Sequence, residues 1–355
     1  MTALRDILIA RIAQSGPISV ADYMADCLLH PEHGYYTTRD PLGAAGDFIT
    51  APEISQMFGE LLGLCLAQCW LDQGAPAPFA LAELGPGRGT LMADLLRATR
   101  AVPGFHAGLR LHLVERSPVL RKAQQARLAG WDIAFHDSAA ALPADLPLVL
   151  VANEFFDALP VRQFQRDADG WRDRLVGAAG GALRFGLGPR GPQPALAHRL
   201  EDTRDGDLVE LCPGAQAIAG EIGARIAARG GAALIVDYGD WRSQGDTLQA
   251  LRGHAPQDPL AQPGAADLTA HVDFEALAHA AAPAVHSRLT PQGVFLERIG
   301  ITQRARALAA GLAGDALEQH IAAHRRLTHA GEMGSLFKIL SLHPTGAAPP
   351  PGLNT

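Results

Sequence analysis

A glycine-rich turn at residues 83–89 carries the clearest chemical signal in this sequence. It reads Glu-Leu-Gly-Pro-Gly-Arg-Gly and joins a short apolar run to a helical pattern. Glycine at Gly85, Gly87 and Gly89 lets the backbone turn sharply and approach a ligand closely, because no Cβ is in the way. The spacing differs from the G-x-G-x-x-G of dinucleotide sites, and Glu83 would repel a pyrophosphate but attract a cation. We therefore expect Glu83 and the three glycines to bind a positively charged nucleoside cofactor such as S-adenosylmethionine.

Two further acids follow the next two predicted strands. Glu115 ends the strand after the glycine turn, where a carboxylate can accept hydrogen bonds from both ribose hydroxyls. Asp137 follows the next strand and could accept a hydrogen bond from the adenine amino group. An isolated acid at a strand end is often only a solvated loop charge, so each acid is weak evidence alone. Their order on successive strands predicts a nucleoside site that includes Glu115 and Asp137.

The elements that must hold these residues form a pattern typical of a parallel sheet covered by helices on both faces. From residue 79 onward, short apolar runs alternate with helical patterns, which indicates an α/β, doubly wound, Rossmann-like sheet. We predict core strands at 79–84, 109–114, 133–135, 148–152 and 232–236, with a closing strand at 335–340. Turn-bounded runs predict antiparallel strands at 161–164, 171–176 and 183–187. The stretch 241–272 is rich in Gly, Pro, Asp and His, and we expect a loop there.

These patterns divide the chain into a core with additions. Residues 1–78 are expected to form an N-terminal helical or lid segment. The cofactor-binding core is expected to span 79–160 and 231–342, interrupted at 161–230 by inserted strands and a helix. The tail at 343–355, with three consecutive prolines, is expected to be disordered.

Capping signals set the expected helix boundaries near the N-terminus. Ser19, with Asp22 at the third position, has the capping-box spacing and predicts a helix that ends before Pro31. Thr50 and Glu53 have the same spacing and predict the start of a long apolar helix.

Composition places the chain among ordinary globular proteins. The 355 residues carry a net charge of −7 with a pI near 6.0, which argues against holding DNA or RNA by bulk electrostatics. No apolar run approaches the roughly 20 residues that a membrane-spanning helix needs, so no membrane insertion is expected. The four cysteines form no C-x-x-C pair, and we expect no metal site. The N-terminus resembles neither a signal peptide nor a transit peptide, so we expect a cytoplasmic location.

Four stretches together resemble the MidA family of class I methyltransferases. They are residues 46–60, 83–89, 153–161 and 237–239, and the likeness covers about residues 15–340. The first and third stretches are specific, because ordinary methyltransferases lack them. The resemblance implies a class I methyltransferase fold with an added N-terminal helical segment, and S-adenosylmethionine as the cofactor. The lack of a mitochondrial presequence fits a bacterial homologue of the family's mitochondrial member.

That mitochondrial member is a complex I assembly factor that methylates an arginine, which implies an acceptor for this chain. The implied partner is a protein, the hydrogenase-like core subunit of respiratory complex I; a homodimer is also conceivable. A guanidinium stays protonated at accessible pH, so carboxylates must bind and orient it. The expected catalytic residues are therefore Asn153, Glu154 and Asp157, which follow the fourth strand, together with Asp47 from a lid over the cofactor. Asn153 is also expected to contact the cofactor.

Several of these residues have a plainer interpretation as well. Asn153 and Asp157 could only cap the turn that follows the strand. For Thr50, which lies beside the expected lid, helix capping is the favoured role. Tyr35 and Tyr36 could wall an arginine channel, although aromatic side chains in such segments more often pack. The turn at 237–239 follows another strand and could contribute to the acceptor side.

Different classes of function remain open from the sequence. Protein-arginine methylation on the complex I subunit is favoured by the resemblance. The alternative from another class is an assembly chaperone that binds S-adenosylmethionine without essential catalysis. Methylation of a small molecule or of RNA also fits, because the fold hosts many acceptors, although the acidic net charge argues mildly against RNA. A nicotinamide dehydrogenase is least favoured, because the spacing of the glycine turn is wrong for it.

Overall fold

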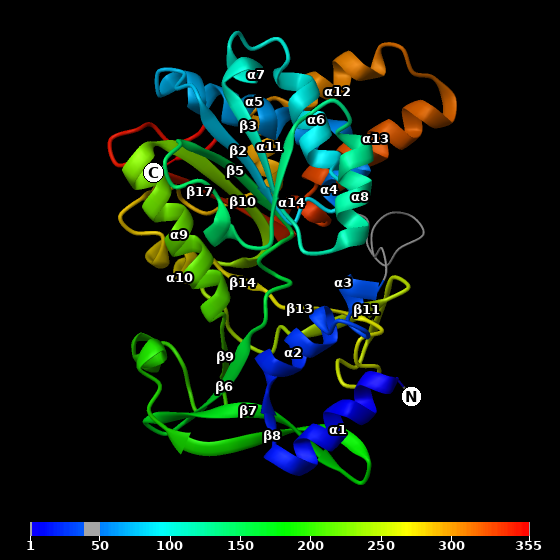
Figure 1. The fold of residues 1–355 in the computed structure, drawn as a ribbon, viewed down its shortest axis with the longest axis vertical. Helices are drawn as coiled ribbons and strands as arrows, with labels where there is room; N and C mark the ends of the chain where they lie inside the picture. The colour runs from blue at the N-terminus through cyan, green and yellow to red at the C-terminus, as the bar shows by residue number, and fades with distance from the viewer. Residues whose placement is uncertain (1, 39–49, 355) are drawn as a thin grey trace.

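A central β-sheet forms the upper half of the molecule (Figure 1). The computed structural model describes residues 2–38 and 50–354. Within these residues the strands run in the order β15-β17-β10-β5-β2-β3-β4, with β14 beside β10 and β16 beside β17. Their bounds are β2 Phe79–Leu84, β3 Leu109–Val114, β4 Ile133–His136, β5 Leu148–Asn153, β10 Gly231–Asp240, β14 Val272–Asp273, β15 Val285–His286, β16 Thr290–Pro291 and β17 Phe337–His343. The pairs β10–β5, β5–β2, β2–β3 and β3–β4 are parallel, whereas β17 is antiparallel to β10.

The five core strands and the closing strand confirm the prediction from the sequence. β2 and β3 have the predicted bounds, and the other strands differ only at their ends. These apolar runs form strands because the sheet is buried on both faces, so neither side of a strand needs polar residues. Alternate residues pack on opposite faces: Leu81 and Val149 lie in one apolar cluster, and Ala80 and Leu148 lie in the other.

Helices cover both faces of this sheet. One face packs on α5 Gln56–Asp72, α6 Thr90–Thr99, α7 Phe105–Gly108, α11 Gln292–Arg298, α12 Ile301–Ala309, α13 Gly314–Thr328 and α14 Met333–Leu336. The opposite face packs on α9 Pro213–Arg229 and α10 Phe274–Ala280. The helix α8, Pro118–Arg127, follows β3, and the side chain of Ser117 caps its first turn. The result is a three-layer, doubly wound α/β fold.

A second unit forms the lower half of the molecule (Figure 1). It contains a sheet in the order β1-β7-β6-β9, with β8 beside β7, and a three-stranded sheet in the order β12-β11-β13. The bounds are β1 Ile18–Ser19, β6 Arg162–Asp167, β7 Gly170–Ala179, β8 Ala182–Gly191, β9 Leu208–Leu211, β11 Gln249–Arg252, β12 Ala255–Gln257 and β13 Asp267–Thr269. The helices are α1 Ala3–Ser15, α2 Val20–Leu29 and α3 Tyr35–Thr38. Ser19 and Asp22 form the predicted capping box of α2.

One apolar cluster holds this lower unit together. Leu4 and Leu8 from α1 pack with Tyr23 from α2 and with Val176 from β7. The N-terminal helices α1 and α2 therefore pack against strands of the inserted segment. In contrast, α9 from the insertion and α5 from the N-terminal segment pack on the central sheet.

The long apolar helix begins later than predicted. Thr50 precedes a separate short helix, α4 Ala51–Ile54, and its side chain makes no capping hydrogen bond. Ser55 caps α5 instead. The carboxylate of Glu53 accepts a hydrogen bond from the Thr90 hydroxyl at 2.5 Å, and is therefore bound to the first turn of α6. The capping-box spacing at Thr50 was misleading because Ser55 offers a second capping side chain five residues later.

Two regions that were expected to be irregular contain ordered elements. The stretch 241–272 includes β11 and β13, which pair with each other. The tail after β17 packs against the core rather than being disordered. Leu353 is 5% exposed and joins the apolar cluster on the α5 face, and the carbonyl of Asn354 accepts a hydrogen bond from the Arg288 N–H at 2.7 Å. The tail is ordered in spite of its proline-rich composition because the apolar side chain of Leu353 is buried in the core.

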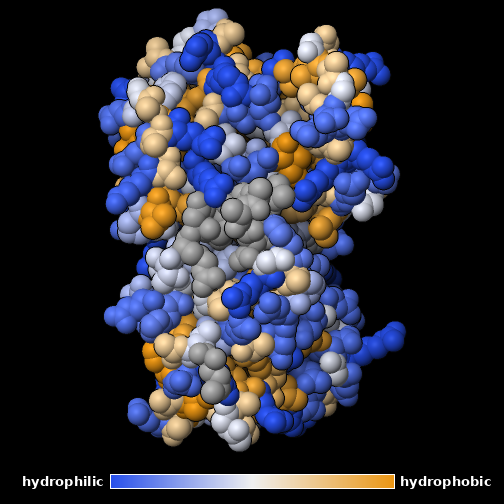
Figure 2. Space-filling model, turned by 90° about the vertical axis from the view of Figure 1, so that its right-hand side faces the viewer, coloured by the Kyte–Doolittle hydropathy of each residue, from blue (hydrophilic) through white to orange (hydrophobic). Residues whose placement is uncertain are grey.

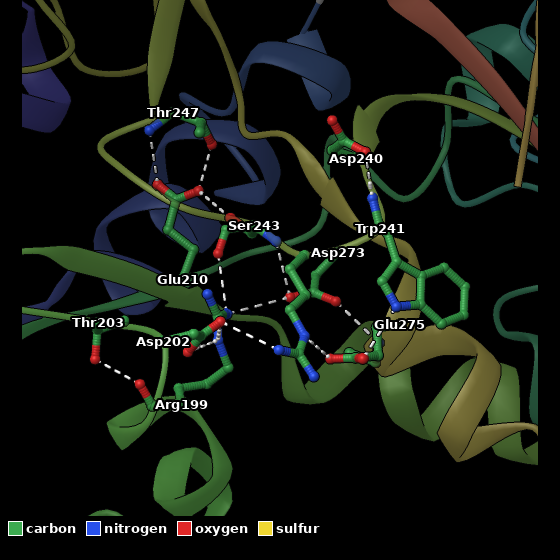
Figure 3. A network of polar contacts seen from close by, with 12 residues as sticks. Arg199, Asp202, Thr203, Glu210, Asp240, Trp241, Ser243, Thr247, Asp273 and Glu275 are labelled. Atoms are coloured by element: carbon green, nitrogen blue, oxygen red, sulfur yellow. Dashed lines mark hydrogen bonds and ion pairs between the residues drawn. The ribbon is translucent and has the colours of Figure 1, made fainter.

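A network of polar contacts joins the lower unit to the core (Figure 3). The buried Arg199, from the 3₁₀ helix Pro194–Leu200, donates from Nη1 to the Ser243 carbonyl at 3.0 Å. The Ser243 N–H in turn donates to Asp273 at 3.1 Å, and Asp273 caps α10. Glu210 on β9 accepts a hydrogen bond from the Thr247 N–H at 3.1 Å. These contacts link β9 and the 3₁₀ helix to the start of α10.

The surface shown in Figure 2 mixes hydrophilic and hydrophobic residues in small patches. Across the part of the chain that the structure describes, no helix combines the length and hydrophobicity needed to span a membrane. In the same residues, no group of three or more His, Cys, Asp or Glu side chains could hold a metal ion.

Candidate active site

The glycine turn leaves β2 at the carboxyl edge of the sheet and enters α6. Gly85, Gly87 and Gly89 have φ angles of 59°, 53° and 77°, which lie in the left-handed region that favours glycine. A Cβ on Gly85 would also lie 2.9 Å from Cδ2 of Phe155, closer than a real carbon contact allows. The positive φ of Gly85 and the close approach of the loop after β5, which carries Phe155, therefore both require glycine here.

A cavity opens at this turn. It is lined by residues of α4, the glycine turn and the end of β5: Thr50, Pro52, Glu53, Glu83, Gly85, Pro86, Gly87, Arg88, Thr90, Leu91, Asn153 and Glu154. The cavity thus brings together residues from β2 and β5, which are far apart in the sequence. The predicted residues among its lining are Glu83, Gly85, Gly87, Asn153 and Glu154. The carboxyl edge of a parallel sheet is the usual place for a ligand in such folds.

Glu83 shows what kind of ligand this cavity fits. Its side chain is 3% exposed, and its Oε2 has no hydrogen-bond partner among residues 2–38 and 50–354. Burial raises the pKa of Glu83 to about 8, although the backbone N–H of Met92 opposes the rise. A buried carboxylate with an unsatisfied oxygen is stabilised by a nearby cation. The cavity therefore fits the charged amino group and sulfonium of S-adenosylmethionine.

Glu115 and Asp137 lie outside the lining of this cavity. Glu115 accepts hydrogen bonds from the Ser117 N–H at 2.7 Å and from the Gln124 amide at 3.4 Å, and burial raises its pKa. A carboxylate has about four acceptor positions, so the predicted ribose contact stays a prediction that these bonds leave open. The Asp137 side chain is 83% exposed and pairs with Arg121 at 2.7 Å. That placement gives no support to the predicted adenine contact.

Glu154 occupies an unusual position directly after β5. Its φ is 51°, which is uncommon for any residue other than glycine and often marks a functional site. Its Oε1 accepts hydrogen bonds at 3.3 Å from both the Ala51 N–H and the Asn153 side-chain amide. Burial and then the charge of Asp157 raise the pKa of Glu154 to about 7. In addition, Oδ1 of Asn153 is buried without a partner among the described residues.

Asp237 fixes the loop that carries these residues. Its Oδ2 accepts hydrogen bonds from the backbone N–H groups of Phe155, Phe156 and Asp157 at 3.2, 2.9 and 3.3 Å. Its Oδ1 accepts another from the Tyr238 N–H at 3.0 Å. Burial and the charges of Asp157 and Glu154 raise the pKa of Asp237, while the backbone donors oppose that rise. The sequence placed the 237–239 turn near the acceptor but did not reveal this role, because the partners come from another strand.

Asp157 completes a group of three carboxylates, the buried Asp157 and Asp237 and the partly buried Glu154, which we call the acidic cluster. Asp157 is 6% exposed, and its Oδ1 has no hydrogen-bond partner within the described part of the chain. Burial raises the pKa of Asp157 to about 6, while the Tyr238 hydroxyl and nearby backbone N–H groups oppose the rise. The backbone N–H groups that donate to Asp157 agree with the interpretation that it caps the turn. Its Oδ1 has no partner among the described residues, so this oxygen can still accept a hydrogen bond from a bound cation.

Tyr36 approaches the acidic cluster from the lower unit. Its hydroxyl donates to Asp267 at 3.0 Å, and the charge of Asp157 contributes to the raised pKa of Tyr36. The buried Tyr35 packs edge-on against it, with 5.2 Å between the ring centroids. No motif placed Asp267 near the acceptor side, because β13 lies in the stretch that was taken for a loop. Asp47 lies outside the described residues, so its lid role stays a prediction.

A second cavity lies between β9, α9 and α10. Its lining includes Phe156, Arg199, Glu210 and His271, and it contains none of the residues predicted to bind cofactor or acceptor. Its acidic residues already have hydrogen-bond donors, as Glu210 does from Thr247. The cavity at the glycine turn therefore stays the predicted cofactor site, because Oε2 of Glu83 has no hydrogen-bond partner among the described residues there.

Known proteins are similar to this chain in sequence and fold. Residues 61–291 match the family described as "Putative S-adenosyl-L-methionine-dependent methyltransferase". The chain is 39% identical to the zebrafish protein arginine methyltransferase NDUFAF7, over 94% of this chain and 85% of the relative, and 37% identical to the human protein, over 95% and 82%. A solved structure from Burkholderia thailandensis, bound to S-adenosyl-homocysteine, superposes with a TM-score of 0.84 at 31% identity. It covers 99% of this chain and 94% of its own.

The fold and the cavity define a class I methyltransferase that depends on S-adenosylmethionine. The matches over almost the whole chain confirm the resemblance seen in the motifs. The chain belongs to the MidA family of S-adenosylmethionine-dependent methyltransferases, and S-adenosylmethionine is its cofactor.

Proposed function

We propose that this methyltransferase modifies an arginine side chain of a protein. The observation that carries the proposal is the acidic cluster beside the cofactor cavity, in which Oδ1 of Asp157 is buried without a partner among the described residues. Glu154 belongs both to this cluster and to the lining of the cavity, so the cluster and the cofactor site are adjacent. A guanidinium carries a permanent charge and several N–H donors, and it satisfies buried carboxylates better than a neutral acceptor does.

The residues of the cluster suit methyl transfer to a guanidinium nitrogen. Bound S-adenosylmethionine supplies a methyl group for in-line displacement from its sulfonium. The carboxylates of Glu154 and Asp157 bind the guanidinium and orient one nitrogen, which is most of what such a reaction needs from the protein. When that nitrogen forms its bond to carbon it loses a proton, and Glu154 or Asp157 accepts it. The raised pKa values of about 7 and about 6 make either group a competent acceptor near neutral pH.

Relatives named protein arginine methyltransferases support the same acceptor class. We propose the hydrogenase-like core subunit of respiratory complex I as the target, during assembly of that complex in a bacterial cytoplasm. The basis for this target is the family resemblance. The acidic cluster supports an arginine acceptor but does not select one protein.

The acceptor class is tested by reconstitution with the candidate target. The purified chain is incubated with the recombinant core subunit and S-adenosylmethionine carrying a deuterated methyl group, and peptides are sequenced by mass spectrometry. We expect label on arginine only. Glu154→Gln should abolish labelling while S-adenosylhomocysteine still binds, as measured by calorimetry. If the deuterated methyl group is found only on lysine, or only on an RNA added as a competing acceptor, the proposal of an arginine acceptor is wrong.

The target itself is tested in cells. Complex I from a strain lacking this gene should carry an unmodified core subunit, and its intact mass should rise again when the gene is restored. Restoration with Gly87→Val, which blocks the left-handed glycine turn, should leave the subunit unmodified. If complex I nevertheless assembles normally with that variant, the chaperone alternative accounts for the assembly role. An unchanged arginine mass in the deletion strain would exclude this target.

A further inference from the structure

Gln124 lies between two parts of the cofactor site, and no motif marks it. It belongs to α8 and its side chain is fully buried, at 0% exposure. Its Nε2 donates to the Gly87 carbonyl at 2.7 Å and to Oε2 of Glu115 at 3.4 Å. One amide nitrogen therefore contacts both the glycine turn and the predicted ribose acid.

The orientation of this amide is fixed by its partners. The Gly87 carbonyl and the Glu115 carboxylate are both acceptors, so only the NH₂ group of Gln124 can face them. The reverse orientation would place three oxygens together. The contact to Gly87 is short and the one to Glu115 is long, so the glycine turn is bound more tightly than the acid.

The glycine turn also packs directly on this residue. A Cβ on Gly89 would lie 3.5 Å from Cγ and 3.6 Å from Cα of Gln124, which is ordinary contact distance. The turn leaves β2 and Glu115 leaves β3, so their relative position is set by the sheet register and by whatever bridges the loops. Glu115 is held from its other oxygen by the Ser117 N–H at 2.7 Å, and Gln124 supplies the bridge to the turn.

We propose that Gln124 is a positioning residue for the cofactor, whose amide ties the Gly87 carbonyl to the Glu115 carboxylate before the cofactor binds. The bridge fixes the peptide plane after Gly87 and the direction of the Glu115 carboxylate together. Binding then needs no reorganisation of either group, which lowers the entropic cost of association. This role concerns cofactor binding and is independent of the acceptor, so it stands or falls separately from arginine methylation.

Two substitutions at Gln124 and one beside it test the proposal. Gln124→Met keeps the side-chain size and removes both hydrogen bonds, whereas Gln124→Glu keeps the shape and replaces the donor with an acceptor. Gln125→Glu makes the same charge change one residue later on α8, at an exposed position. Affinity for S-adenosylhomocysteine is measured by titration calorimetry, and each cofactor-free variant is melted to check its fold.

The two variants should weaken binding in different ways. Gln124→Met should bind S-adenosylhomocysteine roughly 10-fold more weakly at every pH, because it loses one short and one long hydrogen bond. Near pH 8, where a second carboxylate faces Glu115, Gln124→Glu should bind S-adenosylhomocysteine more than about 30-fold more weakly than the wild type at the same pH. Near pH 5.5 most of this difference from the wild type should disappear, because protonation makes the new side chain a donor again. Gln125→Glu should bind like the wild type.

The charged groups around this position do not reproduce that signature. Arg121 donates from Nε to the Glu115 carbonyl and pairs with Asp137, and the carbonyl of His136 accepts from the Glu115 N–H. These groups are the same in wild type and variants, so only the substituted side chain changes the pH dependence.

Two results would overturn the proposal. The first is wild-type affinity, within twofold, for a folded Gln124→Met. The second is equal weakening by Gln124→Glu at pH 8 and pH 5.5, which would indicate a structural defect rather than a lost donor. If Gln124→Met fails to fold, Gln124→Glu at the two pH values still decides, since its fold is checked at each.

Discussion

The buried carboxylate of Glu83 predicts that cofactor binding depends on pH. Burial raises its pKa to about 8, so in the cofactor-free protein about 1% of Glu83 is ionised at pH 6 and about half at pH 8. The ammonium group of S-adenosylhomocysteine attracts only the ionised form. The apparent affinity should therefore rise by about 50-fold between pH 6 and pH 8, equivalent to about 2.3 kcal/mol. The ligand's own ammonium stays protonated across this range.

Calorimetry at several pH values measures this effect directly. Near pH 6.5, repeated titrations in buffers of different ionisation enthalpy should show about one proton released per ligand bound. Glu83→Gln should remove both the slope and the proton release, and should bind more weakly than the wild type above pH 8. Glu154 also lines the cavity and has a raised pKa, so Glu154→Gln serves as the control that should keep the slope. A flat wild-type profile, or an unchanged slope in Glu83→Gln, would refute the reasoning.

Three further substitutions test other parts of the structure. Gly85→Ala should lower the melting temperature more than Gly74→Ala, because both glycines have positive φ but only Gly85 has a side chain within contact distance; equal losses would show that crowding is unimportant. Asp237→Asn should change S-adenosylhomocysteine affinity less than about threefold yet slow methylation at least about 100-fold, because it disturbs the loop of the acidic cluster and not the glycine turn. The methylation rate is measured by steady-state kinetics with the reconstituted acceptor, and equal losses of affinity and rate would contradict this reasoning. Leu353→Ala should cost about 2–4 kcal/mol in urea unfolding, against less than about 0.5 kcal/mol for the exposed Leu187→Ala, and similar values would argue that the tail does not contribute to the core.

Much of the fold could be predicted from the sequence, because its signals are local. The core strands are apolar runs bounded by turns, and a fully buried parallel sheet demands such runs. The glycine turn was equally clear, since left-handed backbone and close approach both select glycine. In contrast, the boundary between α4 and α5 depended on a choice between Thr50 and Ser55, two capping residues of similar strength. Local signals do not settle such a choice.

The candidate site was predictable only in part, because contacts between strand ends are not local. Glu83 and Glu154 could be predicted because Glu83 lies near the end of one predicted strand and Glu154 comes just after another, each within a motif. Asp267 was missed because β13 is short and lies in a Gly- and Pro-rich stretch. Gln124 was missed for another reason: a glutamine in a helix normally faces solvent, and only the packing of α8 against the glycine turn shows that it is buried.

The acidic cluster has a consequence for the stability of the protein without a ligand. Burial gives Asp157 and Glu154 pKa values of about 6 and about 7, above the ordinary values near 4. Groups with raised pKa stabilise the folded state fully below about pH 4, and that stabilisation is lost as the pH rises towards 7. At neutral pH the folded chain therefore confines like charges, although the charge of Arg326 opposes the raised pKa of Glu154. A lysine side chain at this position would neutralise the carboxylates and raise the free energy of unfolding, but it would also fill the place where an acceptor binds. The site therefore has lower stability at neutral pH and can bind and release a cation.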